Sequence, residues 1–309
     1  MSVISFRLFG KFSIERTARQ IEGLDSSKER ELVSYLLINR HRPHARETLA
    51  GLLWGETTTE KSKKYLRQAL WHLQTALVPD KPGGPQILLV QHDWIRLNLE
   101  GELWLDVAEF EKAFAMMQGV PGKHLDSQRA QALENAVQLY TGDLLEGCYQ
   151  DWCIYERERL QNAYLLMLDK LMSYCEEHQE YERGLIYGTT ILRYDRARES
   201  TYRQLMHLQY MADDRTGALR QYERCVAALA EELGVAPDQR TQSLYKRIRD
   251  DKVSEGDPPE NHPPPFTPVA SLPELLTRLK ELHSILAATQ RRVQKDIRAV
   301  ELGIKTEQQ

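Results

Sequence analysis

The chain has 309 residues, of which 41% are hydrophobic and 28% charged, a composition typical of a globular protein with two or three domains. No apolar run approaches the roughly 20 residues that a membrane-spanning helix needs, and the N-terminus lacks the pattern of a secretory signal. We therefore expect a cytoplasmic protein without a membrane partner. The four cysteines form no CxxC pair and are expected to be reduced thiols rather than a disulfide framework.

The net charge of −4 is unevenly distributed along the chain. Residues 1–100 hold 15 Lys and Arg against 11 Asp and Glu, a net charge of +4, whereas the remaining residues carry −8. A basic segment followed by an acidic one favours a polyanion as the partner of the first segment. The excess is small, so it only adds to the patterns described next.

The N-terminal residues have the composition of short strands. Residues 3–9 and 12–14 are rich in β-branched and aromatic side chains, and Gly10-Lys11 separates them as a turn. We therefore expect a small sheet at the start of the chain.

Two helices are predicted after this sheet. Ser26 and Glu29 have the spacing of a capping box, which indicates the start of a helix, and residues 39–43 end it. A second, short helix is expected over residues 46–54, followed by a polar loop over residues 55–59.

The sequence of residues 61–77, KSKKYLRQALWHLQTAL, predicts an amphipathic helix. Four leucines recur at intervals of four, three and four, the spacing of one buried helix face: Leu66, Leu70, Leu73 and Leu77. Long polar and aromatic side chains that can reach phosphates or base edges lie between them: Lys61, Lys63, Lys64, Arg67, Gln68, Trp71, His72, Gln74 and Thr75. Such a helix fits the major groove of DNA, although an ordinary amphipathic surface helix has the same pattern.

A pair of strands is predicted directly after this helix, over residues 86–90 and 95–99. His92 lies in the turn between them and joins the candidate DNA-binding residues. Trp94, at the end of the turn, is expected to pack on the hairpin, and Trp71 either contacts a base or packs beneath the hairpin. A sheet, three helices and a terminal hairpin are the order of a winged helix.

The segment LVSYLLINRHRPHARETLAGLLW, followed by a helix and a strand pair, resembles the DNA-binding domain of OmpR-type regulators. It is more similar still to that of the SARP family, bacterial activators with a BTAD domain, in which the third helix reads DNA and the hairpin is the wing. The resemblance implies that the polar loop over residues 55–60 faces RNA polymerase. It also implies these contact positions on the third helix: Lys64, Gln68, Trp71, His72, Gln74 and Thr75. The family usually has an Arg-Leu-Arg-like segment at residues 72–74, and its absence implies weaker phosphate binding and a different base preference.

Residues 103–114 lead into a second region whose pattern is almost wholly helical from residue 127 to 249. This region repeats with a period of 34 residues, because Leu171-Met172 aligns with Leu205-Met206 and Gly184-Leu185 with Ala218-Leu219. That period is typical of tetratricopeptide (TPR) helix pairs, which stack into an array. Residues 139–160 and 218–245 closely resemble the BTAD domain, and with the first region the resemblance covers residues 1–250.

The C-terminal residues have a different composition. Seven of the 13 prolines lie between Pro258 and Pro273, which predicts a flexible linker. Beyond it, apolar residues at heptad-like spacing indicate a coiled-coil or partner-binding helix. Self-pairing of this helix would give a homodimer on paired DNA sites, and docking on the repeats or on another protein are the alternatives.

We find no pattern of an enzyme or of a cofactor. The nine histidines form no HxxxH or HExxH pair, and no cysteine lies at ligand spacing from one, so no metal site is expected. Gly83-Gly84 lacks the Lys-Ser/Thr of a phosphate loop and is interpreted as a turn. The charged run over residues 156–159 is interpreted as a solvated helix face.

The predicted fold is therefore mainly α, in four parts. We expect a winged helix-turn-helix domain (1–101), an all-α TPR-like domain (102–250), a Pro-rich linker (251–273) and a C-terminal amphipathic helix (274–309). The predicted function is a DNA-binding transcriptional activator whose partners are double-stranded promoter DNA, RNA polymerase and a second copy of the chain. The alternative is a TPR-type protein-interaction scaffold without sequence-specific DNA binding.

Overall fold

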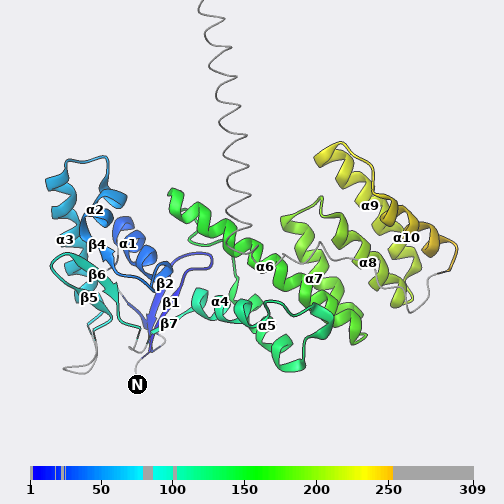
Figure 1. The fold of residues 1–309 in the computed structure, drawn as a ribbon, viewed down its shortest axis with the longest axis horizontal. Coiled ribbons are helices and arrows are strands. Elements are labelled where there is room, and N and C mark those ends of the chain that lie inside the picture. The colour runs from blue at the N-terminus through cyan, green and yellow to red at the C-terminus, as the bar shows by residue number, and fades with distance from the viewer. Residues whose placement is uncertain are drawn as a thin grey trace, which may run out of the picture. The chain divides into compact units, whose positions relative to one another are not determined.

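The computed structural model describes residues 3–252 apart from residues 18, 22–23, 25, 79–85 and 100–102 (Figure 1). Nearly all of the predicted linker and the whole predicted C-terminal helix lie outside these residues. The described part is mainly helical with small sheets near the N-terminus, which confirms the predicted fold class.

A four-stranded sheet begins the chain and takes its last strand from much later in the sequence. Its order is β3-β2-β1-β7, with β1 antiparallel to β2 and parallel to β7. The strands are β1 (Ile4–Arg7), β2 (Ser13–Arg16), β3 (Arg19–Gln20) and β7 (Leu103–Leu105). Gly10 has a φ of +78° in the segment between β1 and β2, a conformation that glycine adopts without strain. The small sheet predicted from residues 3–14 is confirmed, but its fourth strand, in residues 103–105, was not predicted.

Three helices and a second sheet form the winged helix. The helices are α1 (Ser27–Ile38), α2 (Arg46–Trp54) and α3 (Thr59–Ala76). The sheet has the order β4-β6-β5, all antiparallel, from β4 (His44–Ala45), β5 (Leu88–Val90) and β6 (Trp94–Leu97). The predicted leucine face of α3 is buried, because Leu66, Leu70, Leu73 and Leu77 are each at most 3% exposed. Below, the four-stranded sheet and the winged helix together are called the head.

The predicted capping box at α1 was wrong. Ser26 occupies the N-cap position but makes no side-chain hydrogen bond there. The Glu29 carboxylate contacts Nδ1 of His72 on α3 instead, and Glu29 is only 7% exposed. A buried carboxylate needs a partner, and an imidazole from a neighbouring helix satisfies this one without a local cap.

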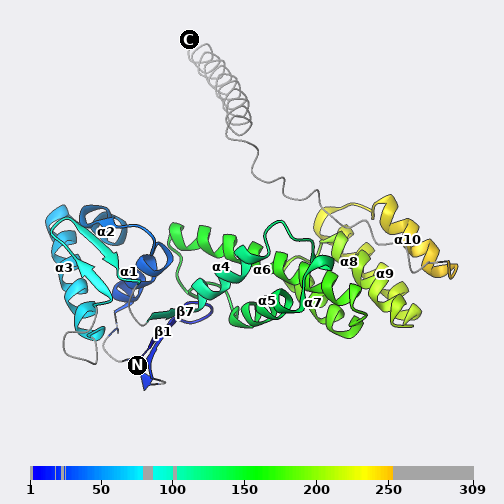
Figure 2. The same ribbon diagram turned by 60° about the horizontal axis from the view of Figure 1, so that its bottom comes forward.

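The rest of the described chain is a series of helices, called the array below (Figures 1 and 2). They are α4 (Asp106–Met116), a short 3₁₀ helix (Gly122–His124), α5 (Ser127–Leu139), α6 (Asp151–Glu177), α7 (Tyr181–Tyr194), α8 (Glu199–Met211), α9 (Arg215–Leu233) and α10 (Gln239–Arg249). The 34-residue period corresponds to the pairs α6–α7 and α8–α9. Leu171 and Leu205 are both buried, and so are Gly184 and Ala218 at the matching position of the second helix in each pair.

Close packing between α7 and α8 explains one glycine of the repeat. A Cβ added at Gly188 would lie 2.6 Å from Cδ2 of Leu205 and 2.7 Å from Sδ of Met172. A side chain at this position would therefore force the side chains of Leu205 and Met172 to move.

The head and the array share one hydrophobic core, which runs without interruption from Ile4 to Ile191. Asp106, at the start of α4, accepts the backbone N–H of Leu8 at 2.7 Å and that of Phe9 at 2.9 Å, just after β1. Its second oxygen accepts the N–H of Val107 at 2.7 Å. Burial raises the pKa of this carboxyl, and the three N–H donors oppose that rise. A single carboxylate thus joins the end of β1 to the first helix of the array.

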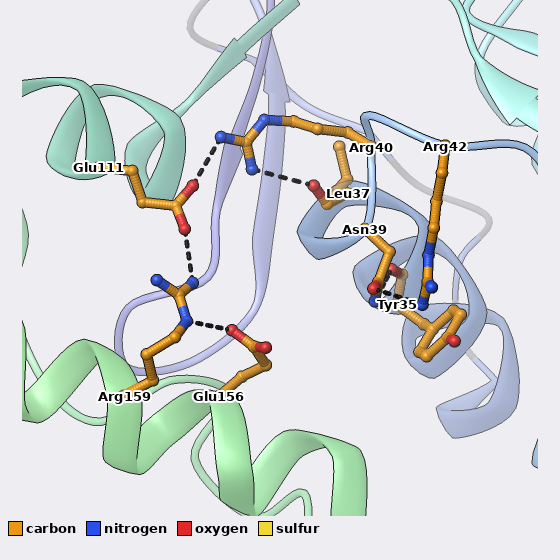
Figure 3. A network of polar contacts seen from close by, with 8 residues as sticks. All are labelled: Tyr35, Leu37, Asn39, Arg40, Arg42, Glu111, Glu156 and Arg159. Carbon is orange, nitrogen blue, oxygen red and sulfur yellow. Dashed lines mark hydrogen bonds and ion pairs between the residues drawn. The ribbon is translucent and has the colours of Figure 1, made fainter. Parts of the chain in front are cut away.

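A polar network crosses the same junction on its surface side (Figure 3). Arg40, in the loop after α1, donates to Glu111 of α4 at 2.6 Å and to the carbonyl of Leu37 at 3.4 Å. Arg159 of α6 binds the other oxygen of Glu111 and donates to Glu156 at 2.8 Å. Glu111 is therefore held between one arginine of the head and one of the array.

Candidate nucleic-acid interface

Helix α3 presents its polar face to solvent over most of its length. Eight of the nine predicted contact residues on this helix are exposed: Lys61, Lys63, Lys64, Arg67, Gln68, Trp71, Gln74 and Thr75. The buried leucines on the opposite face pack α3 against α1 and α2. The exposed side chains therefore extend from a helix whose position is fixed. The sequence pattern therefore located the exposed face of α3.

A hollow of about 1150 Å³ lies between the first half of α3, the start of α2 and the turn of the wing. It brings together five of the ten predicted residues: Lys61, Lys63, Lys64, Arg67 and His92. Gln68, Trp71, His72, Gln74 and Thr75 do not line it, because they lie further along α3 or on its other side. The predicted residues thus form a charged hollow and an adjoining stretch of exposed helix.

The wing turn is held beside α2 by backbone contacts. The N–H of Arg46 donates to the carbonyl of Asp93 at 3.0 Å, and its guanidinium donates to the carbonyl of Gln91 at 3.3 Å. His92, at the tip, has a side chain that is 97% exposed and contacts Asp93 Oδ1 at 2.6 Å. Residue 46 therefore fixes the position of the tip relative to α3.

The charges in the hollow are mostly cationic and mostly unpaired. Five cationic side chains line it against the three carboxylates of Glu47, Glu60 and Asp93. Lys63 binds Glu47 at 2.6 Å, but both side chains are strongly exposed, and such pairs contribute little stability. No residue in the described part of the chain forms an ion pair with Lys61, Lys64 or Arg67. These three cations are available for a negatively charged partner.

Three of the predicted residues have surroundings that the sequence did not reveal. His72 turns toward α1, where its Nδ1 contacts Glu29, so only part of its ring reaches solvent. Trp71 is 63% exposed, with its ring centroid 5.2 Å from that of His72, so it does not pack beneath the wing. The Thr75 hydroxyl donates to the carbonyl of Trp71 at 2.8 Å but remains exposed.

Sequence reasoning missed two residues of the hollow. Arg46 lies at the first position of α2, and Trp94, at the start of β6, lines the hollow with a ring that is 48% exposed. Trp94, expected to pack on the hairpin, is thus half-exposed and lines the hollow as well. Arg46 could have been found from its place at the N-terminus of a helix beside the third one, whereas the exposure of Trp94 depends on the strand register.

Other kinds of site have less support in the described residues. Within them, no group of three or more His, Cys, Asp or Glu side chains is arranged to hold a metal ion. No helix among them is both long and apolar enough to cross a membrane. A second hollow of about 340 Å³ lies between α4 and α5 and is lined by small and apolar residues with a few polar ones.

Comparisons with known proteins agree on one family. The model of the bacterial transcriptional activator domain, BTAD, matches residues 105–249. Transcriptional regulatory protein MoaR1 of Mycobacterium tuberculosis is 22% identical over 246 residues, which cover 79% of this chain and 79% of MoaR1. Transcriptional regulatory protein EmbR of the same organism is 24% identical over 229 residues, which cover 72% of this chain and 57% of EmbR.

A solved structure shows the same fold. Mycobacterium tuberculosis EmbR in complex with a low affinity phosphopeptide matches with a TM-score of 0.61 at 19% sequence identity. The match covers 82% of this chain and 67% of that one. The arrangement of a winged-helix head on a helical array is therefore shared with a transcriptional regulator.

Proposed function

We propose that the chain, whose residues 105–249 match the BTAD model, is a SARP/BTAD-type regulator that activates transcription by binding promoter DNA through α3 and the wing. The observation that supports this most is the hollow beside α3, where Lys61, Lys64 and Arg67 have no ion-pair partner in the described chain. DNA phosphates are the polyanion that such a surface fits.

The two parts of the α3 surface suit two kinds of DNA contact. The cations around the hollow lie between helix and wing, where they can bind the sugar-phosphate backbone and set the register of the protein. Gln68, Trp71 and Gln74 are exposed beside them on α3 and have the amide and aromatic groups that read base edges in the major groove. We assign His72 a smaller share in base reading than its exposed neighbours, because it contacts Glu29.

The loop between α2 and α3 is the proposed contact for RNA polymerase. Residues 55–58 are exposed and polar in the structure, and α3 begins at Thr59. The loop lies at the opposite end of α2 from Arg46 and the wing turn, next to the end of the hollow that Glu60 and Lys61 line. Two copies of the chain, bound side by side on repeated sites, would present two such loops in the cytoplasm.

Selection of genomic fragments with the purified full chain tests DNA binding. We expect an enriched repeated motif whose affinity falls steeply with salt, because bound phosphates release counterions. Lys64→Ala and Arg67→Ala should each weaken all sequences alike and reduce the salt slope by about 1. Arg196→Ala removes the same charge from the array, where Glu231 and Glu232 already bind it, and is the matched control.

The same measurement separates the proposal from the alternative of a protein-interaction scaffold. A scaffold would enrich no motif at any ionic strength, and its weak binding to DNA would change equally in all three variants. Transcription in vitro at matched promoter occupancy then tests the loop. If replacing residues 55–58 by Gly and Ser left transcription unchanged, the polymerase contact would lie elsewhere.

A further inference from the structure

The two most exposed large hydrophobic side chains among the described residues lie at the start of α6. Tyr149 is 80% exposed and Tyr155 is 72% exposed, and Ile154 beside them is 43% exposed. Exposed residues also recur at the i, i+3, i+4 and i+7 spacing of one helix face: Asp151, Ile154, Tyr155 and Glu158. Tyr149 and these four residues are called the α6 face below. A cluster of exposed apolar side chains marks a surface for a partner.

Contacts on the other side of α6 hold this face in one conformation. The ring of Trp152 packs edge-on against Tyr35 of α1, with centroids 5.2 Å apart. The guanidinium of Arg157 donates to the carbonyl of Leu144 at 3.0 and 3.1 Å and to that of Cys148 at 2.9 Å. The turn before α6 is thus tied to the second turn of the helix, and a preorganised surface loses little conformational entropy when it binds.

The charge of the α6 face is negative. Asp151 and Glu158 are its first and last helical positions, and in the described part of the chain neither carboxylate forms an ion pair. The neighbouring Arg159 already binds Glu111 and Glu156. A partner that complements this face therefore needs an apolar surface bordered by available cations.

The hollow of about 340 Å³ between α4 and α5 has such an apolar surface. Small and apolar side chains line it: Ala113, Met116, Ala132, Ala136 and Leu139. Ligand pockets have volumes of roughly 300–1,000 Å³, so this hollow lies at the small end of the range and accommodates an aromatic side chain.

The border of this hollow carries the cations. Lys112 lines it, is exposed and has no ion-pair partner among the described residues. Trp104 also lines it, and the guanidinium of Arg7 lies over the Trp104 ring, 5.6 Å from the centroid. Glu109 is a carboxylate at the same hollow, so the two cations leave a small positive excess.

We propose that the α6 face of one copy of the chain docks into the α4–α5 hollow of a second copy. Tyr149 and Tyr155 are the aromatic anchors, and the carboxylates of the face lie beside Lys112 and Arg7. Aromatic side chains are the usual anchors of protein interfaces. The inference goes beyond the proposed function, because the contact needs no DNA.

The charges decide between this arrangement and a symmetric one. Two α6 faces in contact with each other would bring four carboxylates together, and like charges across an interface are unfavourable. When two different surfaces meet, each copy keeps one free face and one free hollow, so the contact is heterologous and can continue from copy to copy.

A photocrosslinking experiment tests which surfaces meet. The full chain carries the photoreactive residue p-benzoylphenylalanine in place of Tyr155 and is mixed, without DNA, with an isotope-labelled full chain that lacks this group. We expect mass spectrometry to find crosslinks from position 155 to residues 104–139 of the labelled copy. The control places the same photoreactive residue at Ile186, which is 64% exposed on α7 and should give no crosslink to that region.

Charge reversal tests the same contact by sedimentation of the full chain. Lys112→Glu makes the border of the hollow negative, and Asp151→Lys combined with Glu158→Lys makes the α6 face positive. Each of these two chains alone should self-associate at least ~10-fold more weakly than the wild type, because like charges then meet. An equimolar mixture of the two should regain association, because the face of each then meets an oppositely charged hollow. This recovery would also show that both chains fold.

Three results would overturn the proposal. The first is a set of crosslinks from position 155 to the α6 face or to the residues after 252 of the labelled copy. The second is the absence of crosslinks between copies at the highest soluble concentration. The third is a Lys112→Glu chain that self-associates like the wild type. Because DNA takes no part, each of these results is separate from the outcome of the DNA selection.

Discussion

The head and the array use their cationic side chains in opposite ways. On α3, Lys64 and Arg67 extend toward solvent with no ion-pair partner in the described chain. In the array, single arginines each bind two carboxylates: Arg183 binds Glu134 and Glu180, Arg196 binds Glu231 and Glu232, and Arg203 binds Glu199 and Asp238. A cation that already holds two carboxylates gains little from a phosphate, whereas an unpaired one gains the full contact.

The difference shows why net charge alone was a weak guide to the partner. The excess of +4 over residues 1–100 is small. What distinguishes the head is that its cations are left unpaired on one face of α3 and gathered around one hollow. Pairing depends on which helices lie side by side, so it becomes visible only in the folded chain.

The largest expected loss of stability comes from a substitution at the junction, where the head and the array share a core. Asp106→Ala would leave the N–H groups of Leu8, Phe9 and Val107 buried without an acceptor, and each unsatisfied group costs about 1–3 kcal/mol. We expect urea unfolding of the full chain to show a loss of about 3–5 kcal/mol in a single transition.

The control for this prediction is Asp126→Ala, which removes an exposed N-cap carboxylate of α5 and should cost only ~1 kcal/mol. If Asp106→Ala produced two separate transitions, the head and the array would be independent units, and the comparison between them would apply to two separate folding domains.

A second prediction distinguishes neighbours on α3. Gln74→Ala should change the preferred base at one operator position and cost roughly 1–3 kcal/mol there, because it removes an exposed amide that can read a base edge. His72→Ala should instead lower the stability of the head, because it leaves the buried Glu29 carboxylate without its partner.

Binding to a set of operators with single-base changes, measured beside thermal unfolding, checks both variants. A change in base preference for His72→Ala with unchanged stability would show that DNA binding draws His72 away from Glu29. The Glu29 contact would then be a feature of the unbound protein alone.

The local features of the head and array could be predicted from the sequence, whereas the contacts between distant segments could not. The leucine spacing of α3 and the 34-residue repeat each depend on residues within one or two elements, and the structure has both. Strand β7 is three residues long and pairs with β1 across about a hundred positions, so no local pattern indicates it. Nor does a local pattern indicate the hydrogen bonds that Asp106 accepts from the segment after β1, the contact of His72 with Glu29 or the exposure of Trp94.

A third, smaller effect is expected at the surface of the junction. Arg40→Gln removes the guanidinium that bridges the loop after α1 to Glu111, although Arg159 still binds that carboxylate (Figure 3). The side chain of Arg40 is only 9% exposed, so we expect a loss of about 1–2 kcal/mol in chemical unfolding.

Arg42→Gln is the matched control, because Arg42 lies in the same loop, is exposed and bonds only to Asn39 in the network drawn (Figure 3). Equal stability of the two variants would show that the network in Figure 3 adds nothing to the shared core.

The smallest expected effect is a change in how stability depends on pH, and it comes from strand β4, which pairs with β6 of the wing. His44 of β4 is 7% exposed, its Nε2 contacts the carbonyl of Asn39 at 3.0 Å, and its ring packs edge-on against Tyr35, which in turn packs on Trp152 of the array.

Burial lowers the pKa of His44, an effect opposed by the contact with Asn39 and increased by the charge of Arg42. The folded chain therefore favours the neutral imidazole. The stability that depends on it is fully present above the unfolded pKa of about 6.5 and is lost as the pH falls through the lowered folded value.

Replacing His44 should remove this part of the acid sensitivity. We expect the stability of the wild type to fall by up to about 1 kcal/mol more than that of His44→Gln between pH 7 and pH 5, in urea titrations of the full chain. His41→Gln, an exposed histidine of the same loop, should follow the wild type. If the wild type and His44→Gln lost stability in parallel over this range, protonation of His44 would not be coupled to folding. The edge-on ring contacts from His44 through Tyr35 to Trp152 would then tolerate a charged imidazole, and they would be insensitive to pH.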